Sequence, residues 1–189
     1  MVRNFLGGAL LVLLAGCASS SAPYVTVATA NASVSSGIAL NPGDQLRIAV
    51  FDEPNLTGEF QVDPAGSVAL PLLGKILVKG KTTSGLAQEI SHRLMEGGFV
   101  LEPRVTVDVL QYRPIYVLGE VAAPGEYAFT SDLTLLQAVA KAGGFTARAN
   151  QKVVLLQRSQ WGGQRQVILD TEPLSIIPGD TVIVQESFF

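Results

Sequence analysis

Hydrophobic and polar residues alternate along several short segments of the chain, and this period of two predicts half-buried β-strands. Residues 46–51 alternate in this way directly after the turn sequence Asn41-Pro42-Gly43-Asp44, and residues 105–109 do so again with three valines. Other short strands, separated by turns that contain Gly or Pro, are expected at residues 59–62, 67–70, 75–78, 115–121, 127–129, 152–157, 166–169 and 181–185.

Two other segments have the longer period of amphipathic helices. The first carries Leu86, Ile90 and Leu94 on one face. A Thr or Ser among residues 82–84 is expected to cap this helix, and Gly97-Gly98 to end it.

The second helix is expected from the apolar residues within 135–140. Its cap is expected at Ser131 or Asp132, and its end at Gly143-Gly144. Strands that run into single helices, without regular alternation of strand and helix, predict an α+β fold rather than a doubly wound sheet.

The elements divide into two small β-rich domains, residues 41–112 and 113–189, each with one main helix. Domains of little more than seventy residues bury a limited surface, so we expect them to contact each other or neighbouring chains. Pro-Gly-Asp precedes a strand at residues 42–44 and again at residues 178–180. We interpret this as shared turn chemistry and not as a true repeat, because the helices between the two sequences do not align.

The N-terminal segment has the order of an export signal. Arg3 precedes an apolar stretch at residues 5–14, and Leu14-Ala15-Gly16-Cys17 ends that stretch with small residues. The last four residues resemble a lipobox, the site at which bacterial lipoproteins are cleaved and acylated. An ordinary signal with a cysteine nearby is the alternative, but a lone free thiol would be unusual in an oxidising compartment.

The lipobox resemblance implies a signal peptide at residues 1–16, cleavage between Gly16 and Cys17, and acylation of Cys17. With Ala18 in the next position, it also implies sorting to the outer membrane. Residues 17–40 are then expected to form a flexible tether, since 18–39 carry no charge and are mostly Ala, Ser and Thr. The alternative, that residues 24–27 pair as a strand in an oligomer, stays open.

The composition excludes several classes of protein. The chain is 48% hydrophobic and only 15% charged, yet its longest apolar run, residues 5–15, is far shorter than the ~20 residues that span a bilayer. Ample apolar surface also argues against disorder. A net charge of −3 disfavours nucleic acid as a partner.

The sequence contains few residues that could form a catalytic site. His92 is the only histidine, and no phosphate-binding glycine motif occurs. Asp52-Glu53 could act as the carboxylate pair of a hydrolase, but a strand end before Pro54 more simply exposes two acids to water. We therefore expect no enzyme activity, no metal and no cofactor. Trp161, at an expected hairpin tip, could contact a glycan or a neighbouring subunit, or pack on its own strands.

Several segments are similar to known families. Residues 42–46 with the strand that follows, and residues 62–74, resemble the polysaccharide biosynthesis/export domain. Residues 117–127, 134–138 and 142–145 resemble an SLBB (soluble-ligand-binding β-grasp) domain. Together with the lipobox, these motifs make the chain similar to Wza-like outer-membrane polysaccharide export lipoproteins.

This resemblance implies a ring-shaped homo-oligomer, held at the outer membrane and facing the periplasm, that exports a capsular or extracellular polysaccharide. The expected partner is an inner-membrane polysaccharide co-polymerase. Larger members carry a second SLBB domain and a C-terminal pore helix, so this chain is expected to be a short form without them. The alternatives are a monomeric lipoprotein that binds or senses a periplasmic glycan, and a hydrolase that depends on Asp52-Glu53.

Overall fold

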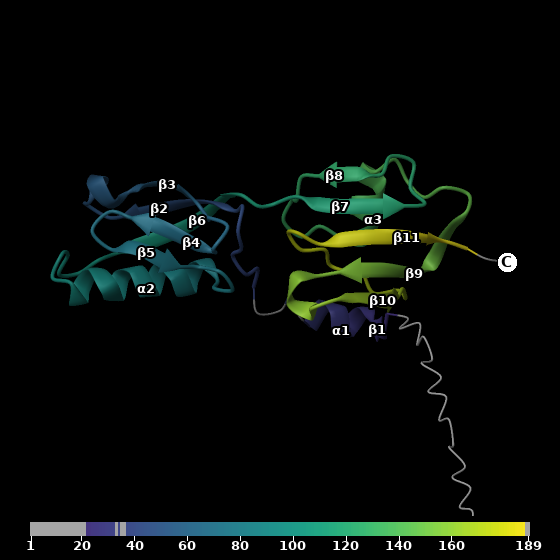
Figure 1. Ribbon diagram of the computed structural model, residues 1–189, viewed down its shortest axis with the longest axis horizontal. Coiled ribbons are helices and arrows are strands. Elements are labelled where there is room, and N and C mark those ends of the chain that lie inside the picture. Colours follow the sequence, from purple (N-terminus) through teal and green to yellow (C-terminus); the bar gives the residue numbers. More distant parts are fainter. Residues whose placement is uncertain (1–21, 33, 35–36, 188–189) are drawn as a thin grey trace, which may run out of the picture.

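The computed structural model describes residues 22–32, 34 and 37–187, and its two domains lie side by side along the longest axis of the molecule (Figure 1). The predicted signal peptide, its cleavage site and the acylation site at Cys17 lie outside the described residues. The chain passes between the domains twice, once between Ala32 and Leu40 and once at residues 112–114. None of the helices in the described part of the chain is long and apolar enough to cross a membrane.

The N-terminal domain packs one helix against a small antiparallel sheet. The sheet has the strand order β3-β2-β6, and a separate hairpin of β4 and β5 lies beside it. Its elements are β2 (Gln45–Val50), η1 (Pro54–Leu56), β3 (Gly58–Gln61), β4 (Ser67–Leu70), β5 (Gly74–Leu77), α2 (Thr83–Glu96) and β6 (Val105–Gln111).

The alternation predicted for residues 46–51 places Leu46 and Ile48 in the core of this domain. They pack in one cluster with the apolar residues of α2, among them Leu86 and Ile90. The Thr82 hydroxyl accepts a hydrogen bond from the Gly85 N–H at 3.2 Å, so Thr82 is the cap among the three candidates that the sequence offers.

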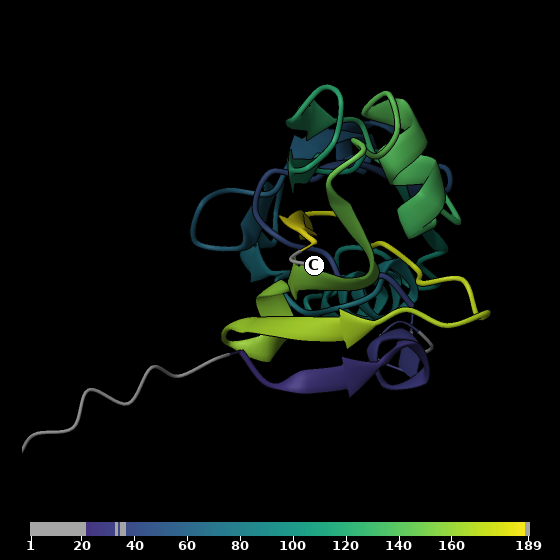
Figure 2. The ribbon, with the colours of Figure 1, turned by 90° about the vertical axis from the view of Figure 1, so that its right-hand side faces the viewer.

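The C-terminal domain is built on a six-stranded mixed sheet with the order β1-β10-β9-β11-β7-β8. The β1–β10 and β11–β7 pairs are parallel, and the other pairs are antiparallel. Helices α1 and α3 lie on the same face of this sheet (Figure 2). The elements are β1 (Tyr24–Thr26), α1 (Val27–Ala32), β7 (Ile115–Gly119), β8 (Gly125–Tyr127), α3 (Leu135–Lys141), β9 (Ala149–Gln157), η2 (Ser159–Trp161), β10 (Gln164–Ile168) and β11 (Thr181–Glu186).

The predicted tether at residues 17–40 is wrong for residues 24–32, which fold onto the C-terminal domain. β1 forms the edge strand of the six-stranded sheet, with Tyr24 opposite Gln166 and Thr26 opposite Ile168. In α1, Val27 is fully buried in the core of that domain. The C-terminal domain is therefore assembled from two separate parts of the chain, and the N-terminal domain lies between them in sequence.

The second helix begins later than predicted. Its cap is Thr134, and neither Ser131 nor Asp132 caps it. The Thr134 hydroxyl accepts from the Gln137 N–H at 3.4 Å while the Gln137 side chain accepts from the Thr134 N–H at 2.9 Å, which forms a capping box. Asp132 instead has a φ of +58°, and the buried Leu133 that follows anchors the chain before the helix starts.

The predicted strands are present, and all but the strand at 67–70 have shifted ends. The expected strand at 115–121, for example, ends at Gly119, and the expected strand at 127–129 lies at 125–127. The α+β fold with two small β-rich domains is confirmed.

Candidate functional site at the domain junction

The Pro-Gly-Asp turn before β2 buries its aspartate completely. Oδ2 of Asp44 accepts a hydrogen bond from the Asn41 N–H at 2.8 Å, and the Asp44 N–H donates to the Asn41 carbonyl at 3.2 Å. Gly43, between them, has a φ of +96°, a left-handed conformation that favours glycine. The aspartate therefore closes its own turn and still has a second oxygen to offer another donor.

The Pro-Gly-Asp turn before β11 repeats this geometry. Oδ2 of Asp180 accepts from the Ile177 N–H at 2.9 Å, and the Asp180 N–H donates to the Ile177 carbonyl at 3.1 Å. Gly179 has a φ of +82°. The shared turn chemistry predicted for the two sequences is confirmed.

Each aspartate pairs with a different arginine, and the pair at Asp180 is buried. Nε and Nη2 of Arg158 donate to the Asp180 carboxylate at 3.1 and 2.8 Å, and both side chains are no more than 1% exposed. Arg158 also donates to the carbonyls of Ala30 and Ser175, each at 2.8 Å. Burial raises the pKa of the Asp180 carboxyl, and the Arg158 guanidinium opposes that rise. This network fixes α1 to the turn before β11.

Arg113 lies where the two turns approach each other. Its Nη1 donates to Oδ1 and Oδ2 of Asp44 at 3.2 and 3.0 Å, and its backbone N–H donates to Oδ1 at 3.0 Å. On the other side, the Gly179 N–H donates to the Pro114 carbonyl at 2.9 Å. A Cβ atom at Gly179 would lie 2.6 Å from Nε of Arg113. The arginine of the linker thus contacts both Pro-Gly-Asp turns.

A hollow of about 420 Å³ adjoins this junction and is lined by the end of β6, by β8 and by residues 128–131. The rings of Tyr112 and Phe129 meet edge to face, with centroids 5.3 Å apart. Burial raises the pKa of the Tyr112 hydroxyl, and the negative charge of Asp44 acts in the same direction. Gln111 and Thr130 add an amide and a hydroxyl to the lining. Glu126 adds a carboxyl group. Aromatic rings beside such polar groups suit contact with a hydroxyl-rich molecule.

Trp161 lies at the predicted hairpin tip, between β9 and β10. Its ring packs against the core of the C-terminal domain and is only partly exposed. The guanidinium carbons of Arg158 and Arg165 lie 5.1 and 4.7 Å from the ring centre. These contacts agree with the interpretation that Trp161 packs on its own strands. Its contact with a glycan or a neighbouring subunit stays a prediction.

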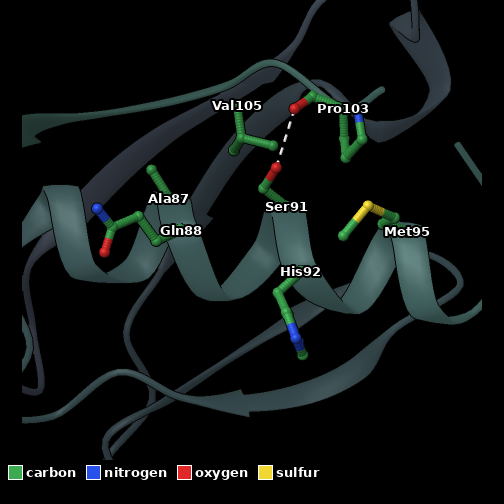
Figure 3. Close-up of a pocket in the computed structure, with 7 residues that line it drawn as sticks. All are labelled: Ala87, Gln88, Ser91, His92, Met95, Pro103 and Val105. Carbon is green, nitrogen blue, oxygen red and sulfur yellow. Dashed lines mark hydrogen bonds between the residues drawn. The ribbon is translucent and has the colours of Figure 1, made fainter. Parts of the chain in front are cut away.

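His92 and its neighbours on α2 line a shallow surface pocket beside the start of β6 (Figure 3). The Ser91 hydroxyl donates to the Pro103 carbonyl at 2.9 Å, while the His92 side chain points away from Ser91. Nδ1 of His92 lies 3.2 Å from a carboxylate oxygen of Glu96, and both side chains are largely exposed. The histidine therefore has the surroundings of an exposed helix residue.

Asp52 and Glu53 follow the end of β2 in a surface turn. Asp52 is exposed and has a φ of +59°, and Glu53 immediately precedes η1. In residues 22–32, 34 and 37–187, no three His, Cys, Asp or Glu side chains come together in a way that could hold a metal ion.

The charged residues of the junction are the ones that sequence reasoning missed. The repeated Pro-Gly-Asp marks Asp44 and Asp180 as turn residues, but their burial follows only from the folded structure. Arg113 and Arg158 carry no local signal, because their partners are 69 and 22 residues away.

Comparison with known families divides the chain at the same point as the structure does. The family model for "Polysaccharide biosynthesis/export protein" matches residues 32–110, and the family model for "SLBB domain" matches residues 114–169. The two matches together cover most of the chain and leave the junction residue Arg113 between them.

Three curated relatives illustrate the similarity. The chain is 41% identical over 103 residues to an exopolysaccharide production protein, ExoF, of Rhizobium meliloti, and this alignment covers 54% of the chain and 24% of the relative. It is 35% identical over 109 residues to a polysialic acid transport protein, KpsD, of Escherichia coli, and this alignment covers 56% of the chain and 19% of the relative. It is 30% identical over 180 residues to an EPS I polysaccharide export outer membrane protein, EpsA, of Ralstonia nicotianae, and this alignment covers 78% of the chain and 47% of the relative. The chain thus spans between about a fifth and a half of the length of these relatives.

Proposed function

We propose that this chain, as a member of the polysaccharide biosynthesis/export protein family, forms an oligomeric collar in the periplasm. The collar would export a capsular or extracellular polysaccharide. The observation that carries this proposal is the family match over residues 32–110, followed directly by the SLBB match. The relatives named for export and transport support it as well.

The collar is held at the outer membrane by acyl chains on Cys17. The Leu14-Ala15-Gly16-Cys17 sequence supports this anchor, and a relative named as an outer membrane export protein supports the location. Two or more acyl chains hold a protein firmly at a bilayer, whereas one does not. An inner-membrane polysaccharide co-polymerase would deliver the polymer from the opposite side of the periplasm.

The mechanism proposed is passive conduction and not catalysis. The acids considered for hydrolysis lie in an exposed turn, and the only histidine lies on an exposed helix face. Closed rings form when head-to-tail interfaces repeat with a rotation that closes on itself. A ring of these two-domain bodies would surround the polymer and guide it without a chemical step.

Deletion of the gene tests the proposal. We expect the amount or chain length of secreted polysaccharide to change, with recovery by the wild-type gene. A matched Cys17→Ser gene separates the anchor from the folded body: it should yield the folded protein without acylation and restore export poorly. Normal export with normal chain length in the deletion strain would contradict the proposal.

The mass of the detergent-solubilised protein distinguishes a collar from a monomeric glycan-binding lipoprotein. For a collar, light scattering should give a single species whose protein mass is a whole-number multiple, greater than one, of the chain mass. A stable monomer at every concentration would favour the glycan-binding alternative.

A further inference from the structure

Among the described residues, no helix or strand covers one face of the six-stranded sheet at β7, β11, β9 and β10. Helices α1 and α3 cover the opposite face, and Figure 1 looks onto the arrows of β7, β11, β9 and β10 without an intervening element. The strand register identifies the side chains on the open face, because alternate residues of a strand point to opposite sides of a sheet. We call this surface the outer sheet face.

The residues of the outer sheet face lie in adjacent rows across the strands. In the central row, Leu155 lies opposite Ile183, which lies opposite Leu118. The strand pairings place the following side chains on this face: Tyr24, Thr26, Tyr116, Leu118, Val153, Leu155, Gln157, Gln164, Gln166, Ile168, Thr181 and Ile183.

The outer sheet face is uncharged, and Leu155, Ile183 and Leu118 form an apolar strip on it that is flanked by Gln and Thr residues. Within the described residues of β1, β10, β9, β11 and β7, none of the side chains that the register places on this face is Asp, Glu, Lys or Arg. Glu126, on the edge strand β8, is the first charge met beyond Tyr116. Leu118 is 39% exposed and Ile168 is 46% exposed. An exposed apolar strip of this kind is a candidate interaction site.

We propose that the outer sheet face is a contact surface for a second copy of this chain, an inference that rests on the oligomeric collar proposed above. Charge argues for this occupant. The chain carries a net charge of −3, so contact between two copies is opposed less at a surface without charge than at an acidic one. Depletion of charged residues with retention of tyrosine is also the composition found at the centres of protein–protein interfaces.

The area of the face agrees with part of a stable interface. The five strands lie ~4.8 Å apart and are on average about six residues long, which gives a footprint of roughly 450 Å². A standard interface buries about 800 Å² on each partner. The outer sheet face would therefore form the centre of the contact, and the surrounding polar surface would supply its rim.

Substitution of exposed residues tests this assignment without disturbing the core. Leu118→Glu places a charge in the central row of the proposed contact, and Ile168→Glu places one in the adjacent row near the edge strand β1. Leu136→Glu is the matched control, since Leu136 is 66% exposed on α3, away from the outer sheet face. Light scattering of the detergent-solubilised full chain measures the mass, and circular dichroism with thermal unfolding checks the fold.

We expect both outer-face variants to fold like the wild type and to self-associate at least about a hundredfold more weakly, because a buried charge would lack a partner. The Leu136→Glu chain should keep the wild-type mass.

If the wild type is oligomeric and both outer-face variants keep its mass, the inference is wrong while the collar stands. If those variants stay oligomeric but fail to restore polymer export, the face contacts the polymer, and the inference is overturned in that case as well. A wild type that is monomeric overturns both the inference and the collar.

Discussion

Arg113 and Asp44 form an ion pair that joins the linker between the domains to the first turn of the N-terminal domain. Nη1 of Arg113 lies 3.0 Å from Oδ2 of Asp44, whose side chain is fully buried, while the Arg113 side chain is 14% exposed. The backbone N–H of Arg113 donates to the same carboxylate. A carboxylate removed from water depends on such donors, since its hydration has been lost. The position of the linker is therefore tied to the folding of the N-terminal domain.

Removal of the arginine side chain should be costly. Arg113→Met keeps the aliphatic length but leaves Asp44 with backbone donors only, and we expect a loss of about 3 kcal/mol in the free energy of unfolding. Urea unfolding followed by circular dichroism measures it. Arg148→Met is the control, because Arg148 is 65% exposed and pairs with Glu120 and Glu186 at the surface, where a loss below about 1 kcal/mol is expected. Equal losses in the two variants would contradict the role given to Arg113.

Gly179 should tolerate substitution less well than another glycine of the same backbone conformation. Gly179→Ala forces a side chain into the left-handed region, at a cost of about 1–2 kcal/mol, and also displaces the guanidinium of Arg113. Gly162 has a φ of +66°, and a Cβ atom added there would meet open space, so Gly162→Ala carries the backbone cost alone. Thermal unfolding should show a lower Tm for Gly179→Ala. A Tm equal to that of Gly162→Ala would mean that the Arg113 side chain can move aside without a loss of stability.

The elements that the sequence pattern predicts well are those whose signal is local. The strand at residues 46–51 and the helix that follows Thr82 depend on alternation, periodicity and a capping hydroxyl within a few residues. The α3 cap is harder to place, because Ser131, Asp132 and Thr134 are all capping residues by type. Only the burial of Leu133 and the reciprocal bonds with Gln137 select Thr134.

The elements that could not be predicted depend on distant partners. Residues 24–32 are rich in Ala and Thr, a composition typical of a linker, and α1 is too short to show a helical period. Its structure comes from the C-terminal domain, where Arg158, 128 residues away, binds the Ala30 carbonyl. The same holds for the candidate site, since the pairing of Arg113 with Asp44 joins residues 69 positions apart.

The segment of residues 24–32 should contribute to stability although its composition is that of a tether. Val27 is fully buried, and Val27→Ala removes two methyl groups, so we expect a loss of about 2 kcal/mol in the free energy of unfolding of the C-terminal domain. Ala28→Ser, at an exposed position of the same helix, should change it by less than about 0.5 kcal/mol. Urea unfolding compares the two variants. A flexible tether would make both substitutions neutral.

The turn between β3 and β4 should make stability depend on pH through Asp63. The Ser67 N–H donates to Oδ1 of Asp63 at 2.8 Å and lowers the pKa of its carboxyl, and Lys75, 3.6 Å from Oδ2, acts in the same direction. A pKa lower in the folded than in the unfolded state gives stability that is fully present above the unfolded value of about 4 and is lost as the pH falls through the lowered pKa. Asp63→Asn should therefore lower the Tm at pH 7, and its difference from the wild type should shrink below about pH 4.

Lys75→Met shows whether Lys75 or the Ser67 N–H contributes more to the stability that the Asp63 carboxylate provides. Lys75 is 76% exposed, so its charge is screened by water, and we expect a smaller fall in Tm than for Asp63→Asn. The backbone bond from Ser67 remains in Lys75→Met, and most of the dependence on pH should remain with it. Thermal unfolding of the wild type and both variants from about pH 7 to about pH 3 measures these differences. A gap between wild type and Asp63→Asn that stays constant over this range would show that the charge of Asp63 does not stabilise the turn.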